Sequence, residues 1–238
     1  MNRSNILIVV ILLLCAVSVV LEFNQREILS RVFKSCIVPT ITVFYFISVT
    51  KKSKYFVWFL LLFSFSDVLS FIEVHLESDL SFDLYYTFGN LLYIAGYLFL
   101  LLEVFKSISI KDVLKNYMVH LVVLTILNAY IVYVLMVIVN PYLSGSYLYY
   151  IEALYNIIIL ILLSVSLVNY LHNESKKSLL LFIGSLFIVF SEVIQIAYYY
   201  ISERTLLQVA STFLFVIAFL FFYYQSKIEN KPIKIYLS

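Results

Sequence analysis

The sequence predicts an all-α membrane protein with eight transmembrane helices, and three observations support this fold class. Of its 238 residues, 63% are hydrophobic and 13% are charged, whereas soluble domains carry about 25% charged residues. The apolar residues form long runs, most of them close to the roughly 20 residues that cross a hydrocarbon core of about 30 Å. With only four glycines and three prolines, the chain has no flexible linker. We therefore expect residues 1–238 to form a single integral membrane domain.

The eight predicted spans follow one another with short connections. They cover residues 5–23, 33–50, 55–75, 84–105, 117–139, 147–171, 178–200 and 205–225. The second span is the least regular, because Arg31 and Lys34 lie at its start. Long basic side chains at a span end can extend to the membrane interface, and we expect this of Lys34. Pro39 is expected to kink the same helix.

The first span has an alternative interpretation as a signal peptide. Arg3 precedes an apolar run that ends near the small residues Ala16-Val17-Ser18, and cleavage there would leave seven spans. However, the apolar run 5–23 is longer than the roughly 7–15 residues of a signal-peptide core. The sequence therefore favours a first transmembrane helix.

Positive charge is divided unequally between the two sides of the predicted bundle. The side with both termini carries twelve basic residues: Arg3, Lys51, Lys52, Lys54, Lys106, Lys111, Lys115, Lys176, Lys177, Lys227, Lys231 and Lys234. The other side carries four, namely Arg26, Arg31, Lys34 and Arg204. Since cytoplasmic loops are rich in Lys and Arg, we expect both termini in the cytoplasm and the chain in a bacterial inner membrane. The basic residues form no stripe, so nothing indicates a nucleic-acid partner.

Two acidic residues lie deep inside predicted spans. Asp67 follows Phe-Ser in span three, and Glu192 follows Phe-Ser in span seven. An ionisable residue within the membrane is costly and is therefore a candidate functional residue. With a rise of 1.5 Å per residue, Asp67 lies roughly 18 Å and Glu192 roughly 21 Å from the inner ends of their helices, so the two are level. The alternative is a packing role, in which both acids bond Asn, Ser or Tyr across helices.

The segments around the two acids are related in sequence. A shift of 125 positions places residues 51–69 on residues 176–194 without gaps, matching Lys-Lys-Ser, Phe-Ser and the acid. Spans four and eight align more loosely, with Leu92, Leu98 and Phe99 falling on Leu214, Leu220 and Phe221. Both halves would cross the membrane in the same direction. The pattern predicts a parallel 4+4 helix repeat about an axis along the membrane normal.

Other polar residues fall at the level of the two acids. They are Asn90, Asn156, Glu152, Gln195, Gln208 and Ser211. The inner halves of the spans are apolar, as in 56–63 and 179–183, so we expect a polar pocket in the outer half above an apolar floor. Glu152 is close enough to a span end for its carboxylate to reach the interface, and we expect this of Glu73 and His75 as well.

Two buried acids suit acid–base chemistry. Removal from water disfavours the ionised carboxylate, and neighbouring acids then tend to share one proton, which leaves one as acid and one as base. Such a pair fits hydrolysis of a bond that must first be protonated. The sequence has no Gly-x-Ser-x-Gly, His-Glu-x-x-His or phosphate-loop motif, and no His/Cys cluster. We therefore expect neither a metal nor a cofactor.

The chain resembles the YhhN-like family of eight-span membrane proteins, which includes the lysoplasmalogenases. The likeness covers spans two to eight and is specific in three places. The family's Gly-Asp in span three is similar to Ser66-Asp67. Its Ala-His-Leu-Leu-Tyr in span four is similar to Gly89-Asn90-Leu91-Leu92-Tyr93, and its Gly-small-x-Phe, then Ser-Asp, in span seven is similar to Gly184-Ser185-Leu186-Phe187, then Ser191-Glu192.

The resemblance implies hydrolysis of the vinyl-ether bond of lysoplasmalogen to a fatty aldehyde and a glycerophospho-alcohol. It implies catalysis by Asp67 and Glu192. We expect Glu192 to donate the proton, since glutamic acid is intrinsically the weaker acid, and Asp67 to stabilise the cation and activate water. Contacts with the lipid substrate are expected from Asn90, Ser66, Ser191, Gln195, Tyr93 and Asn156.

Three positions differ from the family pattern. The lysine of the family's Lys-Pro in span two is Val38, its span-four histidine is Asn90, and its second aspartate is Glu192. Loss of both basic groups leaves a non-catalytic lipid-binding or scaffold protein as the main alternative. A transporter or proton relay is a further one, but a relay needs polar groups at all depths, and the apolar inner halves argue against it. The sequence does not predict the oligomeric state.

Overall fold

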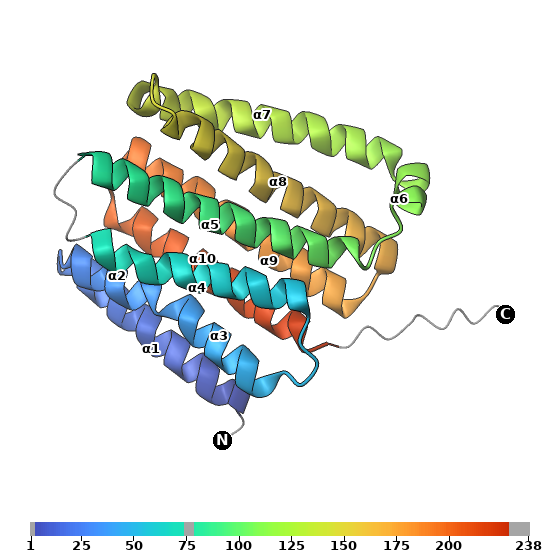
Figure 1. Cartoon of the computed structure of the whole chain (residues 1–238), viewed down its shortest axis with the longest axis horizontal. Coiled ribbons are helices and arrows are strands. Elements are labelled where there is room, and N and C mark those ends of the chain that lie inside the picture. Colours follow the sequence, from blue (N-terminus) through green and yellow to red (C-terminus); the bar gives the residue numbers. More distant parts are fainter. Residues whose placement is uncertain (1–2, 74–78, 229–238) are drawn as a thin grey trace.

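The computed structural model describes residues 3–73 and 79–228, and the regular structure in these ranges is entirely helical (Figure 1). The helices are α1 (Arg3–Phe23), α2 (Glu27–Ser35), α3 (Ile37–Ser48), α4 (Lys54–Glu73), α5 (Asp79–Phe105), α6 (Ile110–Asn116), α7 (Met118–Leu143), α8 (Leu148–Asn173), α9 (Lys176–Tyr200) and α10 (Thr205–Ser226). Helices α2 and α3 together form one span, and α6 is a short connection. In the described residues, eight segments are long and apolar enough to cross a membrane. The predicted all-α, eight-span fold is confirmed.

Span two begins earlier than predicted and is divided into two helices. We predicted residues 33–50, whereas α2 begins at Glu27 and the break between α2 and α3 lies at Cys36. Pro39 explains the break, because proline has no N–H to donate to the carbonyl of Ser35, four residues earlier. The first backbone bond past the break runs from the Thr40 N–H to the Cys36 carbonyl, at 3.1 Å. The kink expected at Pro39 therefore occurs as an interruption three residues upstream.

Other boundaries differ from the predicted ones by a few residues. Helix α5 begins at Asp79 rather than at 84, which adds more than one turn. The short helix α6 was not predicted, because seven residues are too few to show a helical hydrophobic period. Helix α4 ends at Glu73, and the predicted interfacial residue His75 lies outside the described residues.

Six helices form a closed ring. Around the ring, α3 packs on α4, α4 on α5, α5 on α8, α8 on α9, α9 on α10, and α10 on α3. Helix α1 packs outside the ring on α2, α3 and α10, and α7 packs outside it on α8 and α9, so the two form opposite edges of the bundle (Figure 1). The order α1–α2/α3–α4–α5 in one half is matched by α7–α8–α9–α10 in the other. This arrangement agrees with the predicted 4+4 repeat.

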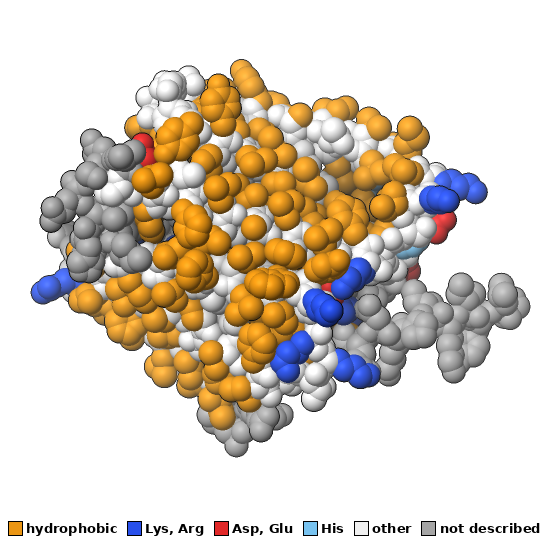
Figure 2. Space-filling view, viewed as in Figure 1, with side chains coloured by type: hydrophobic (Ala, Val, Ile, Leu, Met, Phe, Trp, Pro, Cys, Tyr) orange, Lys and Arg blue, Asp and Glu red, His pale blue; other side chains and the backbone are white. Residues whose placement is uncertain are grey.

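The two ends of the bundle differ in charge. The connections 49–53, 106–109 and 174–175 and the end of α10 lie at one end, which we call the lysine-rich end. Its described lysines are Lys51, Lys52, Lys54, Lys106, Lys111, Lys115, Lys176, Lys177 and Lys227. Lys231 and Lys234, which we predicted on the same side, lie outside the described residues. Figure 2 shows hydrophobic side chains covering the middle of the visible face, with most of the Lys and Arg side chains near one end. That distribution is typical of a membrane-embedded surface.

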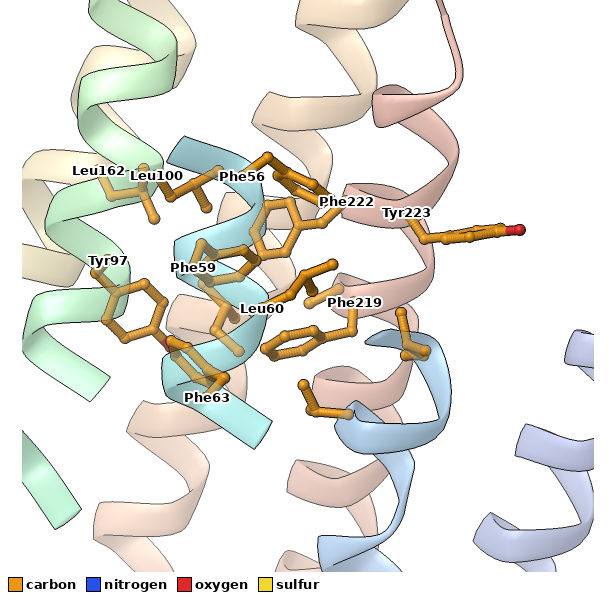
Figure 3. Close-up of a cluster of buried hydrophobic side chains, with 14 of the residues drawn as sticks. Phe56, Phe59, Leu60, Phe63, Tyr97, Leu100, Leu162, Phe219, Phe222 and Tyr223 are labelled. Carbon is orange, nitrogen blue, oxygen red and sulfur yellow. The ribbon is translucent and has the colours of Figure 1, made fainter. Parts of the chain in front are cut away.

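Aromatic side chains fill the ring between the acids and the lysine-rich end. Phe59 and Phe63 of α4 meet Phe219 and Phe222 of α10, as Figure 3 shows. The rings of Phe59 and Phe219 stack with centroids 5.5 Å apart. All four side chains are fully buried. This cluster corresponds to the apolar floor that the sequence predicts.

Candidate functional site

Helices α4 and α9 carry the two acids at similar heights. Asp67 lies six residues before the end of α4, roughly 9 Å along the helix axis, and Glu192 lies eight residues before the end of α9, roughly 12 Å. Both are in the half of the bundle away from the lysine-rich end. Asp67 is buried, with 7% of its surface exposed, and Glu192 is half-buried.

Asp67 has a hydrogen-bond donor on only one of its two carboxyl oxygens. The hydroxyl of Tyr93, on α5, donates to Oδ1 at 2.7 Å. The other oxygen, Oδ2, is buried and has no hydrogen-bond partner in the structure. Buried acceptors are almost always satisfied in native proteins. The open oxygen therefore marks a position where a substrate group or a water molecule can bind.

Glu192 has a tyrosine beside it from a different helix. Tyr155, on α8, interacts electrostatically with the Glu192 carboxyl. The hydroxyl of Tyr97, on α5, is buried without a hydrogen-bond partner by distance and angle, and it lies within electrostatic range of both acids. Among the described residues, no hydrogen bond joins Asp67 to Glu192. Tyr97 is thus a buried hydroxyl within electrostatic range of both carboxyl groups.

Lys34 was expected to extend to the interface, and the structure places it elsewhere. Its ammonium group lies within electrostatic range of both Asp67 and Glu192, and its Nζ is 6.0 Å from the ring centroid of Phe215 on α10. Helix α2, which carries Lys34, packs against α1 and α4. Lys34 is therefore a member of the site that sequence reasoning missed.

The two serines that precede the acids make the same contact in each half of the molecule. Ser66 Oγ donates to the carbonyl of Gly89 at 3.1 Å, and Ser191 Oγ donates to the carbonyl of Ser211 at 2.8 Å. The repeat alignment, with shifts of 125 and 122 positions, places these two bonds on equivalent residues. Both serine protons are thus engaged in helix–helix contacts, and only the oxygen lone pairs are left for a substrate.

The other expected substrate contacts are partly engaged within their own helices. Asn90 donates to the Tyr86 carbonyl of its own helix at 2.9 Å. Asn156 is fully buried on α8, and its Oδ1 has no hydrogen-bond partner. Gln195 is half-buried on α9, three residues after Glu192. Gln208, on α10, also has a buried oxygen without a partner, Oε1.

Glu152 was expected at the membrane interface, and this interpretation is wrong. Its surface is 7% exposed. Its Oε2 accepts a hydrogen bond from the Tyr86 hydroxyl at 2.6 Å, and its Oε1 accepts one from Asn156 Nδ2 at 3.3 Å. The tyrosine holds the carboxyl inside the bundle, although the residue lies only four positions from the start of α8.

The described residues contain no group of three His, Cys, Asp or Glu side chains placed to hold a metal ion. Comparisons of the chain with protein-family models, with curated proteins and with solved structures gave no match. The fold and site together define an integral membrane helical bundle with a buried cluster of two acids, one lysine and several tyrosines.

Proposed function

We propose that this protein is a membrane-embedded hydrolase that cleaves the vinyl-ether bond of lysoplasmalogen-type lysophospholipids. The observation that carries the proposal is that Lys34, on α2, lies within electrostatic range of two acids from other helices, the buried Asp67 and the half-buried Glu192. The resemblance to the YhhN-like family supports the choice of substrate.

The charges in the site fit an acid–base pair. Taken by themselves, the Lys34 ammonium group and the carboxyl groups of Asp67 and Glu192 are electrically neutral when one carboxyl is ionised and the other is protonated. Glu22 lies within electrostatic range of Lys34, and Glu152 within range of Glu192. A neutral cluster is the least costly to hold inside a membrane. The site would therefore hold one proton donor and one carboxylate before substrate binds, as general acid–base hydrolysis requires.

Vinyl-ether hydrolysis consumes one water molecule and involves no net oxidation or reduction. A proton adds to the alkene carbon remote from oxygen, and the resulting oxocarbenium ion takes up water at the carbon bonded to oxygen. The hemiacetal then separates into an aldehyde and the glycerophospho-alcohol. We assign the protonation to Glu192. The carboxylate of Asp67, with its unpartnered Oδ2, stabilises the cation and accepts a proton from water.

Lys34 supplies a basic group that the family pattern places at Val38. The two positions are four residues apart in the sequence, on either side of the break at Cys36. The cation therefore comes from α2, whereas the family pattern places it at the start of α3. Its charge is also suited to attract the phosphate of the substrate headgroup.

The depth of the site fits the position of the scissile bond. The acids lie roughly 9–12 Å from the ends of α4 and α9, and the polar layer of a bilayer is roughly 5–8 Å thick on each side. A vinyl ether lies directly beneath its headgroup, at about this depth. We also infer from the lysine-rich end that both termini are cytoplasmic, so that the site faces the outer leaflet of a bacterial inner membrane.

The test is aldehyde release from lysoplasmalogen by the purified protein in detergent. We expect Asp67→Asn and Glu192→Gln each to lower the rate about a hundredfold or more. Glu103→Gln is the matched control, because Glu103 lies at the lysine-rich end, where Ser53 and Lys106 bind its carboxyl. Unchanged thermal unfolding of the variants would show that they fold. Failure of the wild type to release aldehyde from ether lipids with several headgroups would reject the proposal.

One observation favours the alternative of a non-catalytic lipid-binding protein. The serines before both acids are engaged in helix packing, and Tyr93 binds Asp67, so much of the polar cluster has structural partners. Such a protein would retain lysoplasmalogen in detergent and release no aldehyde. The same assay, combined with measurement of bound lipid, separates the two functions.

A further inference from the structure

A cavity of about 560 Å³ lies at the lysine-rich end, between the ends of α3, α4, α5, α9 and α10. Its volume falls in the range of small-molecule sites, about 300–1,000 Å³. Along α4, the cavity lies roughly 20 Å from Asp67, on the far side of the aromatic cluster. It is therefore separate from the acid site, and its function does not depend on the chemistry proposed there.

The lining of the cavity is positively charged. Lys51, Lys177 and Lys227 line it, and Glu103 is the one carboxylate in the lining. Glu103 accepts a hydrogen bond from Ser53 and lies 3.6 Å from the Nζ of Lys106, a lysine outside the lining. Glu103 also interacts electrostatically with Lys177. Three lysines and one carboxylate give the lining a net positive formal charge.

Hydroxyl groups supplement the lysines. Ser48, Ser53, Thr50 and Ser226 also line the cavity. The hydroxyl of Ser48 is shielded from solvent and has no hydrogen-bond partner in the structure. An unsatisfied buried polar group is unusual in a native protein. Beside three ammonium groups, it indicates that the cavity holds an anion with several acceptor oxygens.

Both positive and negative helix ends lie at this end of the bundle, so the lysines are the main source of positive charge in the cavity. Helices α4 and α9 begin here with the positive ends of their dipoles, whereas α3, α5 and α10 end here with the negative ends. The backbone contributions largely oppose each other. Lys177 lines the cavity from the first turn of α9. A capping box between Ser175 and Ser178 fixes the start of this helix and therefore the position of Lys177.

We propose that this cavity binds a phosphate group, carried either by the headgroup of an anionic phospholipid or by a soluble phosphorylated small molecule. A phosphate has up to two negative charges and several strong acceptor oxygens. These match a set of lysine point charges and hydroxyl donors. The walls formed by Tyr45 and Phe56 accommodate the uncharged part of the ligand.

The experiment compares two adjacent lysines. Lys177 lines the cavity, whereas Lys176 is exposed and is not part of the lining. Binding of glycerol 3-phosphate to the protein in uncharged detergent tests the soluble source. Retention of phosphatidylglycerol against phosphatidylcholine, by native mass spectrometry, tests the lipid source. We expect Lys177→Gln to weaken binding about tenfold or more, and Lys176→Gln to leave it unchanged.

The outcome of the two arms decides both the proposal and the ligand source. Binding of glycerol 3-phosphate supports a soluble ligand, and selective retention of phosphatidylglycerol alone supports a headgroup. As a second variant, Ser48→Ala keeps all charges and is expected to weaken binding without lowering the unfolding temperature, because its hydroxyl has no partner in the free protein. Absence of binding in both arms, or equal loss in Lys176→Gln and Lys177→Gln, would overturn the proposal.

Discussion

The two halves of the molecule repeat a scaffold but support their acids differently. In both, a serine bonds the next helix and an acid follows it. Asp67 then accepts from Tyr93 of that next helix. The position equivalent to Tyr93 in the second half is Phe215, which has no hydroxyl. The tyrosine that interacts electrostatically with Glu192 is Tyr155, on α8. The serine bonds between helices are thus the same in both halves, whereas the tyrosines next to the two acids come from different helices.

The replacement of tyrosine by Phe215 in the second half also affects the surroundings of Lys34. Lys34 Nζ lies 6.0 Å from the centroid of the Phe215 ring, a geometry in which an ammonium group is attracted to an aromatic face. In the half that lacks the tyrosine hydroxyl, an apolar ring therefore lies near Lys34. In the part of the chain that the structure describes, Lys34 is the only lysine within electrostatic range of both acids. This asymmetry gives Asp67 and Glu192 different surroundings, as the different roles assigned to them require.

Making the two acids alike should have the largest effect. Glu192→Asp shortens the side chain by one methylene and moves the carboxyl away from Tyr155. We expect about a hundredfold loss of aldehyde release, the usual consequence of an ångström-scale displacement of a catalytic group. Glu203→Asp, in the exposed connection 201–204, is the control. Full activity of Glu192→Asp would mean that the longer side chain has no role in placing the carboxyl.

The close helix contacts of the two halves are the next test. A Cβ at Gly96 would lie 2.7 Å from the Phe63 ring, and one at Gly184 would lie 2.7 Å from the Phe222 ring and 3.2 Å from the Ala218 carbonyl oxygen. We expect Gly96→Ala and Gly184→Ala to destabilise the protein by about 1–3 kcal/mol. The Gly184 change should be the larger, because backbone yields less than a ring.

Unfolding in detergent measures both glycine variants. Gly89→Ala is the matched control, because its nearest neighbour outside its own helix would be Ser66 Oγ at an ordinary 3.5 Å. A Gly184→Ala protein as stable as Gly89→Ala would contradict the close approach of α9 and α10.

Removing the tyrosine hydroxyls should have a smaller effect on activity. Tyr93→Phe takes away the one donor to Asp67, and Tyr155→Phe takes away the donor beside Glu192. We expect each to reduce aldehyde release about tenfold, the effect of one hydrogen bond to a charged group. Tyr142→Phe, at an exposed position, serves as the control. If only one of the two variants loses activity, the acid next to it carries the slow step.

The smallest effect is expected from the shared serine bonds. Ser66→Ala and Ser191→Ala each remove one interhelical hydrogen bond, worth about 0.5–1 kcal/mol inside a membrane. The two losses of unfolding free energy should be equal, because the bonds are equivalent. Thr125→Ala, exposed and bonded within its own helix, should change stability less. Unequal losses for the serine pair would break the equivalence of the two halves.

The features that follow the helical period could be predicted from the sequence. The eight spans, the common level of Asp67 and Glu192, and the apolar floor depend on residue order along single helices. Lys34, Tyr155 and Glu152 could not be placed, because the direction of each side chain depends on a neighbouring helix. The cavity could likewise not be predicted, since Lys51, Lys177 and Lys227 come together only when the six-helix ring has formed.

The break at Cys36 places Lys34 on one helix, α2, and the residues that pack against the core on another, α3. Helix α3 is fixed to α4 by Thr42 and Ser64, whose hydroxyl oxygens are 2.7 Å apart. Helix α2 carries Lys34 and touches α4 through Ser35 and Ser70, also 2.7 Å apart. Because Pro39 cannot donate to the Ser35 carbonyl, we expect a displacement of α2 to move Lys34 more than it disturbs α3. The electrostatics of the acid site would then change with little effect on the aromatic core.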